Sequence, residues 1–397
     1  MIAHASFLDR LAAFPFRRLA ALLDGIAPPA DLTPIDLALG EPRHPPPPLL
    51  ARTVAEHAHL WNRYPPPAGS PDYRRACAEW LVRRYRLPAD AVDPDRHVLA
   101  LAGTKEGLFT VAGLVAPAPD SPRRLALMPD PLYGVYYGAA VAWGLEPRPL
   151  AATREHGFLP DLDALDEDTL ARTAIFYLCS PSNPQGAVAD AGYLARALEL
   201  ARRFDFLLVL DECYAEIHDG VPPPGGLEVA FARFGDFAHL LVFHSLSKRS
   251  SAPGLRAGFV AGDPALVARF LHLRAYGAPV VPLPLAAAAA RLWRDEAHVA
   301  ENRARYLRKF DLAGEILAGR YGFRRPAGGF FLWLEVDDGE RAAVELWRRA
   351  GVRVLPGGYL SVGPTAAAPG RRYVRVALVH DEATTAEALR RLVAVLG

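Results

Sequence analysis

Cysteine is scarce in this sequence, and its placement excludes several classes of protein. The 397 residues include three cysteines, Cys77, Cys179 and Cys213, which are widely spaced. They form no Cys-x-x-Cys pair and no cluster with histidine at ligand spacing, which argues against a disulfide framework and a structural zinc. Three unpaired thiols fit a reducing compartment. We therefore expect a cytoplasmic protein that binds no metal.

Long hydrophobic runs and blocks of one charge are also missing. The first 25 residues are interrupted by Asp9, Arg10, Arg17 and Arg18, so they lack the apolar stretch of a signal peptide. No apolar run reaches the length that spans a bilayer. The formal net charge is +1, and arginine is frequent and lysine rare without forming a basic block. Nothing in this pattern indicates a nucleic-acid or membrane partner.

The composition and the order of the apolar segments indicate a soluble α/β protein. With 51% hydrophobic and 22% charged residues, the chain has ample material for a large domain and a smaller one. Buried strands are predicted at Val98–Leu101, Leu125–Met128, Ala174–Leu178, Phe206–Leu210, Leu240–Phe243 and Phe259–Ala261. Helices are predicted between them at Lys105–Val115, Tyr133–Trp143 and Tyr193–Phe204. This alternation predicts a mostly parallel sheet sandwiched by helices.

The pattern changes after Pro282. A long charged helix is predicted from Asp295 to Leu317, and a strand, a helix and a second strand are predicted at Gly329–Val336, Glu340–Ala350 and Tyr373–Val379. These elements favour a smaller α+β unit that the N-terminal segment completes. We predict a large domain over residues 45–281 and a small domain formed by residues 1–44 and 282–397.

The most informative segment is Ser245-Leu246-Ser247-Lys248, with Arg256 eight residues beyond the lysine. Lys248 lies just past a predicted strand end, where open α/β sheets place their ligands. A lysine in a serine-rich turn with a second cation downstream suits a group that binds a phosphate and also acts as an amine nucleophile. A solvated lysine in a polar loop is the simpler interpretation of this segment alone.

Four further features follow predicted strands. Gly103-Thr104-Lys105 opens a helix whose free N–H groups suit an anion. Tyr133 follows the next strand, and taken singly it is an ordinary core aromatic residue. Asn183 lies in a turn shaped by proline and glycine. Asp211 ends a very apolar strand, where a carboxylate must cap a helix or pair with a cation, because an unpaired buried charge costs several kcal/mol.

Taken together, these segments resemble the class I and II aminotransferases of fold type I, which depend on pyridoxal phosphate. The resemblance rests on Asn-Pro-x-Gly at Asn183, Asp-x-x-Tyr at Asp211, Ser-x-Ser-Lys at Lys248 and the following Arg256, in this order, and it covers essentially the whole chain. It implies that Lys248 forms the internal Schiff base and moves the proton in catalysis. It also implies that Asp211 pairs with the protonated pyridine nitrogen of the cofactor.

The resemblance implies the remaining site residues as well. Tyr214 and Asn183 would bind the ring hydroxyl oxygen, and Tyr133 would stack on the ring. The phosphate would be bound by the residues Gly103, Thr104, Lys105, Ser245 and Arg256. Tyr64 matches a tyrosine that reaches the phosphate of the neighbouring subunit, which implies a homodimer with shared sites. Arg375 matches the clamp on the substrate α-carboxylate, with the Gly40 backbone close by.

A narrower resemblance, to bacterial N-succinyl-diaminopimelate aminotransferases of lysine biosynthesis, rests on the segments Phe14–Leu19, Leu37–Pro45 and His244–Ser250. It implies glutamate as the donor and N-succinyl-2-amino-6-oxopimelate as the acceptor. The chain departs from that group near Ala275, Val362 and Ala368, which weakens the substrate assignment. Cationic candidates for the distal end of such a substrate are Arg43, Arg249 and Arg274.

The sequence leaves three other interpretations open. The chain could be an aminotransferase for aspartate or for an aromatic or another dicarboxylic amino acid. A β-lyase or decarboxylase on the same fold would keep Lys248 and Asp211 and break another bond. A regulatory domain of this fold would need a DNA-binding module, for which we expect no room before Gly40.

Overall fold

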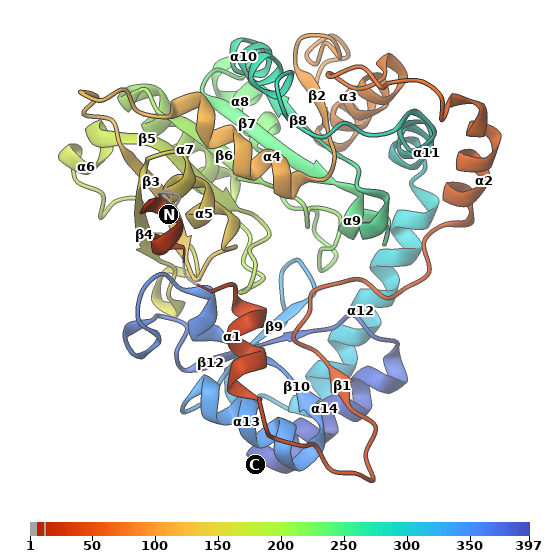
Figure 1. Ribbon diagram of the computed structural model, residues 1–397, viewed down its shortest axis with the longest axis vertical. Coiled ribbons are helices and arrows are strands. Elements are labelled where there is room, and N and C mark those ends of the chain that lie inside the picture. The colour runs from red at the N-terminus through yellow and green to blue at the C-terminus, as the bar shows by residue number, and fades with distance from the viewer. Residues whose placement is uncertain (1–5, 12) are drawn as a thin grey trace, which may run out of the picture.

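The computed structural model describes residues 6–11 and 13–397. Within these residues the larger unit is built on a seven-stranded sheet in the order β2-β8-β7-β6-β5-β3-β4 (Figure 1). The bounds of the strands are β2 Val98–Leu101, β3 Leu125–Asp130, β4 Glu146–Ala151, β5 Thr173–Cys179, β6 Leu207–Asp211, β7 Leu240–Ser245 and β8 Gly258–Gly262. Only β8 runs antiparallel to its neighbours. The fold-type I α/β architecture and the six predicted strands are confirmed.

Strand β4 is the one strand of this sheet that the sequence did not indicate. It pairs only with β3 and therefore forms an edge of the sheet. Its sequence, Glu-Pro-Arg-Pro-Leu-Ala, contains two prolines, and its side chains are exposed or half-buried. Proline lacks the N–H that a central strand needs, so it is tolerated at an edge and there masks the usual strand pattern.

Helices cover both faces of the large sheet because successive strand residues point to opposite faces. Leu208 and Leu210 of β6 pack in one core and Leu207 and Val209 pack in the other. The first core is covered by α3 (Pro71–Tyr85), α7 (Ala191–Phe204), α8 (Gly226–Phe234) and α11 (Leu283–Arg294). The second is covered by α4 (Thr104–Thr110), α5 (Val135–Ala142) and α10 (Pro264–Arg274).

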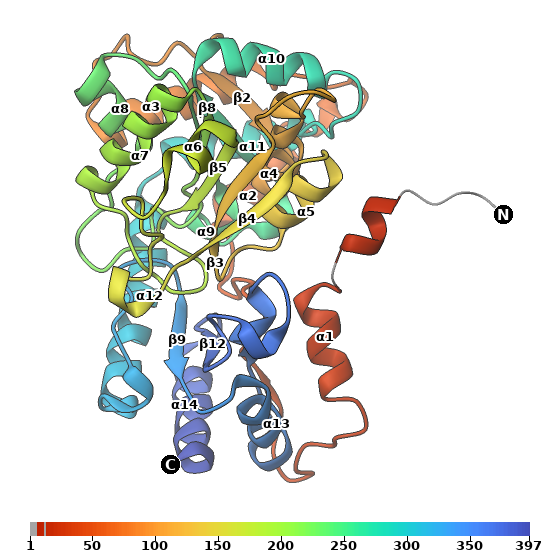
Figure 2. The same cartoon turned by 90° about the vertical axis from the view of Figure 1, so that its left-hand side faces the viewer.

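The smaller unit lies below the larger one in Figure 1. Its antiparallel sheet has the order β11 (Leu355–Pro356), β12 (Tyr373–Ala377), β9 (Phe331–Glu335). The N-terminal segment supplies β1 (Ile35–Asp36), which pairs in parallel with β10 (Val352–Arg353). The helices of this unit are α1 (Pro15–Leu22), α13 (Gly339–Ala350) and α14 (Glu382–Leu396), and α1 lies beside α13 (Figure 2).

Two helices connect the units. Helix α11 packs against α3 and α2 (Pro48–Glu56) of the larger unit, although it follows the predicted boundary at residue 282. Helix α12 (Ala297–Leu317) then runs from the larger unit into the smaller one, where it packs on α14 (Figure 1). The domain boundaries at residues 44/45 and 281/282 stay a prediction.

The described residues show neither a membrane-spanning helix nor a metal-binding cluster. No helix among them combines the length and the apolar character needed to cross a membrane. No three His, Cys, Asp or Glu side chains in residues 6–11 and 13–397 gather in a way that could hold a metal ion.

Candidate active site

The carboxyl ends of the parallel strands open into a cavity of about 290 Å³, which residues from both units line. Arg256 reaches it from the start of the antiparallel strand β8, at the same edge of the sheet. The structure brings these predicted site residues together on the cavity wall: Gly40, Thr104, Lys105, Tyr133, Asn183, Asp211, Tyr214, Ser245, Lys248, Arg256 and Arg375. The predicted residues Gly103 and Tyr64 do not line it.

Lys248 lies on the short helix α9 (Leu246–Arg249), directly after β7. The Ser245 hydroxyl caps this helix by accepting a hydrogen bond from the Ser247 backbone N–H at 3.1 Å. The Lys248 Nζ donates to the Gly40 carbonyl oxygen at 2.6 Å and lies 5.1 Å from the centre of the Phe330 ring. Burial lowers the pKa of Lys248 to about 8. The amine can therefore accept a proton near neutral pH.

Asp211 ends β6 and is buried, with 5% of its surface exposed. Its Oδ2 accepts a hydrogen bond from the Tyr136 hydroxyl at 2.8 Å, and its Oδ1 accepts one from the Cys213 backbone N–H at 3.2 Å. Burial raises the pKa of Asp211, while the hydrogen bonds from Cys213 and Tyr136 act in the opposite direction. A cationic partner in the cavity would make the ionised form favourable.

Tyr136 is a site residue that the sequence reasoning missed. Its ring stacks on Tyr177 at 4.9 Å between centres and an angle of 11°, so the hydroxyl is fixed where it meets Asp211. The available signal was its spacing: Tyr136, the second residue of α5, is three positions after Tyr133, which precedes the helix. Tyr133 faces the cavity, and its ring lies perpendicular to that of Tyr136 at 5.8 Å.

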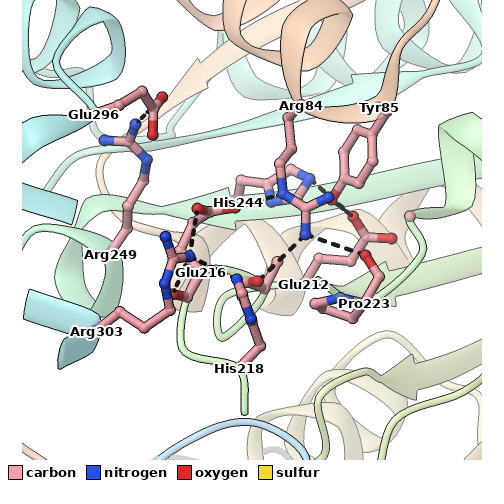
Figure 3. A network of polar contacts seen from close by, with 12 residues as sticks. Arg84, Tyr85, Glu212, Glu216, His218, Pro223, His244, Arg249, Glu296 and Arg303 are labelled. Atoms are coloured by element: carbon pink, nitrogen blue, oxygen red, sulfur yellow. Dashed lines mark hydrogen bonds and ion pairs between the residues drawn. The ribbon is translucent and has the colours of Figure 1, made fainter. Parts of the chain in front are cut away.

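A buried polar network around Glu212 and Glu216 supports the loop that follows β6 (Figure 3). The Glu212 carboxylate accepts hydrogen bonds from the Tyr85 hydroxyl at 2.8 Å and the Gly226 backbone N–H at 2.7 Å. Its Oε2 also lies 2.9 Å from the Nε2 of His244, the residue before Ser245. The network therefore ties the end of β6 to the end of β7, which are the two strands that deliver Asp211 and Lys248.

The same loop is anchored a second time through Glu216. The Arg84 Nε lies 2.7 Å from a Glu216 carboxylate oxygen, and Arg303 of α12 lies 3.6 Å from the other oxygen (Figure 3). Arg84 and Arg303 lower the pKa of Glu216 below its ordinary value although the side chain is buried. This buried carboxylate holds the loop in place, because moving it away would leave the side chains of Arg84 and Arg303 without their anionic partner.

An anion-binding corner lies between Gly103 and Arg256. Gly103 has φ +83°, and a Cβ on it would lie 2.2 Å from the Nη2 of Arg256, so only glycine lets the guanidinium approach. Arg256 donates to two backbone carbonyl oxygens, of Pro253 at 2.9 Å and Ala102 at 3.3 Å. No acidic side chain pairs with it in the described part of the chain. The Ser245 and Ser247 hydroxyls complete a donor set that fits a phosphate.

Arg375 lies on β12 and faces the opposite side of the cavity. It is buried, donates to the Asn183 side-chain oxygen at 2.9 Å and the Ala38 carbonyl oxygen at 2.8 Å, and its Nε has no partner among the described atoms. Burial lowers the pKa of Arg375 to about 10. A buried arginine without a carboxylate partner is arranged to receive one from a ligand.

Tyr214 lies between Lys248 and the smaller unit. Its buried ring contacts Phe330 and Phe331 edge-on at 5.4 and 5.9 Å, and the Lys248 Nζ lies 5.9 Å from the ring centre. Burial raises the pKa of its hydroxyl. Tyr214 is therefore a neutral hydrogen-bonding group on the cavity wall.

The three arginines suggested for the distal end of the substrate lie away from this cavity. Arg249 is buried against α11, where it donates to the Leu292 carbonyl oxygen at 2.7 Å and pairs with Glu296 at 2.7 Å. Arg274 pairs with Glu106, and Arg43 is exposed. None of the three arginines lines the cavity. Arg249 and Arg274 are engaged by long-range partners that a sequence pattern does not reveal.

One wall of the cavity is apolar, and the sequence did not indicate it. It is formed by the residues Phe14, Pro15, Phe16, Leu39, Phe331, Leu355 and Leu360. At the rim, the Lys105 Nζ lies 5.1 Å from the centre of the Phe14 ring. Tyr64 is fully exposed on the surface of the chain.

The fold and this set of residues define a fold-type I enzyme that uses pyridoxal phosphate, since an amine, a buried carboxylate and a phosphate corner meet in one cavity. The chain belongs to the class I and II aminotransferases, whose family model matches residues 33–392. The enzyme is therefore a pyridoxal-phosphate-dependent aminotransferase, as the motifs predicted. Pyridoxal phosphate fits the cavity, because Arg256 and Asp211 are placed to receive an anion and a cation.

Relatives and solved structures agree with this assignment. The chain is 34% identical over 373 residues to an LL-diaminopimelate aminotransferase of Desulforudis audaxviator, covering 91% of this chain and 90% of the relative. It resembles a solved aminotransferase of Neisseria meningitidis with a TM-score of 0.93 and 36% identity, covering 99% and 100% of the two chains. A probable N-succinyldiaminopimelate aminotransferase of Thermus thermophilus matches with a TM-score of 0.83 and 26% identity, covering 96% and 100%.

Proposed function

We propose that this aminotransferase moves an amino group from glutamate to N-succinyl-2-amino-6-oxopimelate in the diaminopimelate branch of lysine biosynthesis. The names of two similar proteins support the pathway: one is an LL-diaminopimelate aminotransferase and the other a probable N-succinyldiaminopimelate aminotransferase. The departures near Ala275, Val362 and Ala368 leave the succinyl group as the part of the proposal that most needs a test.

The observation that supports the reaction best is the placement of Lys248 and Arg375 on one cavity. Arg375 would bind the α-carboxylate of the amino acid, because its guanidinium pairs with no carboxylate in the described structure and its Nε has no partner. The Gly40 carbonyl oxygen, which now accepts from Lys248, lies beside that position. Lys248, with its lowered pKa, would then take the proton from the substrate Cα.

The other residues would hold the cofactor. Gly103, Thr104, Lys105, Ser245 and Arg256 would hold the phosphate. Bound pyridoxal phosphate supplies an electron sink for the bonds at the substrate Cα.

Four residues would contact the cofactor ring, and a fifth would position one of them. Asp211 would bind the ring nitrogen as its counter-ion, and Tyr136 would keep that carboxylate in position. Tyr214 and Asn183 would donate to the ring oxygen, and Tyr133 would cover the ring face.

We also propose that the active unit is a homodimer in which Tyr64 completes the phosphate site of the partner. Tyr64 is fully exposed in the single chain and Trp61, one turn earlier, is 56% exposed. Aromatic side chains so exposed are typical of an interface. A tyrosine at this position has no contact with the cavity of its own chain, so its role in the site requires a second copy.

The apolar wall favours a second candidate, an aminotransferase for an aromatic amino acid. Phe14, Phe16, Leu39, Leu355 and Leu360 offer an aromatic side chain more contact than they offer a carboxylate. Of the cations that line the cavity in the described part of the chain, Lys105 lies at the rim. Its backbone N–H is the group proposed for the phosphate, which leaves its side chain for a distal carboxylate.

Steady-state kinetics with a panel of acceptors separates the candidates. With glutamate as donor, the succinylated oxo acid should exceed phenylpyruvate and oxaloacetate in kcat/KM by at least about tenfold, or roughly 1.4 kcal/mol of differential transition-state binding. LL-diaminopimelate with 2-oxoglutarate tests the substrate without the succinyl group. A preference for phenylpyruvate would keep the aminotransferase and discard the lysine pathway.

A variant of Lys105 sharpens the same test. Lys105→Met should lower kcat/KM for the succinylated acid and leave the value for phenylpyruvate within a factor of about two, because only the first has a distal carboxylate. An equal loss for both acids would mean that Lys105 acts on the cofactor phosphate alone.

A further inference from the structure

Lys309 is one of three lysines in a chain with 45 lysines and arginines, and it has no assigned role in the site. It lies on α12, the helix that joins the two units, and its side chain is completely buried. Burying an ammonium is expensive unless its N–H groups are all paired. A lysine kept at such a position, in a chain that otherwise uses arginine, indicates a geometric requirement that the planar guanidinium does not meet.

The surroundings of Lys309 meet the requirement of an ammonium group. Its Nζ donates to the backbone carbonyl oxygens of Leu378 and His380, the second at 3.0 Å, and lies 3.1 Å from the Nε2 of His44. The centre of the Tyr306 ring is 4.2 Å away. Three acceptors around one nitrogen match the three N–H groups of lysine. Burial lowers the pKa of Lys309 to about 7, and deprotonation above that pH would leave at least one acceptor without its donor.

The donor and acceptor roles of His44 and Asn302 follow from the fact that Lys309 donates. Because Lys309 can only donate in its charged form, the Nε2 of His44 must accept, and its proton is then on Nδ1. That Nδ1 lies 3.3 Å from the Oδ1 of Asn302, so it donates there. The Asn302 amide in turn donates to the backbone carbonyl oxygens of Lys248 at 3.0 Å and Arg249 at 3.2 Å. Burial and the nearby Lys309 lower the pKa of His44 to about 4, which keeps its ring neutral for this role.

The segments held by these bonds each supply a part of the site. Leu378 and His380 directly follow β12, which contains Arg375. His44 follows Gly40, whose carbonyl oxygen accepts from the Lys248 side chain. We propose that Lys309 is a positioning residue: through His44 and Asn302 it fixes the strand end of Arg375, the Gly40 segment and the turn of Lys248 relative to one another.

Lys309→Met tests this proposal, because methionine is of similar length and cannot donate. In the loaded enzyme, kcat/KM for glutamate should fall by at least about tenfold, mainly through KM, since small displacements of positioning groups have large effects on rate. In the cofactor-free protein, hydrogen exchange should rise in peptides covering residues 41–47 and 378–381. Exchange and KM equal to those of the parent would overturn the proposal.

Two companion variants keep the test decisive. Arg308→Met removes a charge one residue away on the same helix, where Arg308 is exposed and pairs with Glu382, and it should match the parent in exchange and KM. Asn302→Leu removes the contact with His44 and the two bonds to the backbone of Lys248 and Arg249, but leaves Lys309 and its two carbonyl partners in place. Exchange should therefore rise at residues 248–251 and stay unchanged at 378–381. If Lys309→Met does not fold, Asn302→Leu decides: parental exchange at 248–251 would refute the role of the relay.

Discussion

Replacing Asp211 by asparagine tests the assignment of the cofactor-nitrogen partner. Asparagine has the same shape, and its side-chain oxygen can still accept from Tyr136 or the Cys213 backbone, so the β6 end should keep its structure. The change removes the negative charge from a buried position, where a neutral amide cannot hold the ring nitrogen protonated. A preorganised electrostatic interaction of this kind is worth roughly 3–4 kcal/mol, so kcat/KM should fall by on the order of a few hundredfold.

The same substitution should not destabilise the cofactor-free protein. Burial raises the pKa of Asp211, so between its unfolded and folded pKa values the folded chain holds a proton that the unfolded chain has released. Unfolding then releases a proton, and the contribution of Asp211 to stability falls as the pH rises through this window and stays lower above it. Asparagine avoids this cost. The cofactor-free variant should melt at or above the temperature of the parent at pH 7, with the difference shrinking toward about pH 4, the ordinary carboxyl range.

The assay pairs calorimetry of the two cofactor-free proteins at several pH values with steady-state kinetics of the loaded forms. Tyr136→Phe provides a graded comparison, because it keeps the charge and removes one hydrogen bond to a charged group, worth roughly 1.5–3 kcal/mol. Activity of Asp211→Asn within a few-fold of the parent would show that the carboxylate only caps the strand. A large loss of melting temperature would show that the charge stabilises the fold.

Three other results follow from the site. Borohydride reduction of the loaded enzyme and peptide mapping should place the cofactor on Lys248, and a label on another lysine would refute the mechanism. Sedimentation should show a dimer. Tyr64→Ala should weaken the retention of the cofactor but leave the dimer associated. A fully active monomer would refute the shared site. Glu216→Ala should lower the free energy of unfolding by about 3–5 kcal/mol because it leaves Arg84 buried without its partner, whereas a loss below about 1 kcal/mol would show that water replaces the pair.

The sequence was sufficient for the parts of the site that lie in short local patterns. Lys248 follows an apolar strand within four residues, and Asp211 ends another, so a strand pattern and a turn locate both. Parallel strands then bring the two together at one edge of the sheet. The same logic placed Asn183 and Tyr133 correctly on the cavity, because each follows its strand directly.

The sequence was not sufficient where a side chain depends on a distant partner. Arg249 looked available for a substrate, yet it is turned toward Glu296 and the end of α11, 40 or more positions further along the chain. His44 and Lys309, 265 positions apart, have no common pattern that would join them. Edge strand β4 was not predicted for a different reason: its two prolines give it the sequence pattern of a loop.

The same contrast separates the chemistry of this enzyme from its choice of substrate. The groups proposed to hold the cofactor come from neighbouring strand ends of a single sheet, so the fold alone brings them together. The apolar wall proposed to meet the substrate side chain is assembled from Phe14 to Phe16, Leu39, Phe331, and Leu355 with Leu360, which come from four separate stretches of the chain. A few substitutions in these stretches can change the acceptor without disturbing Lys248 or Asp211. Relatives with similar motifs can therefore share the reaction and differ in substrate, and the acceptor panel decides the substrate where the family cannot.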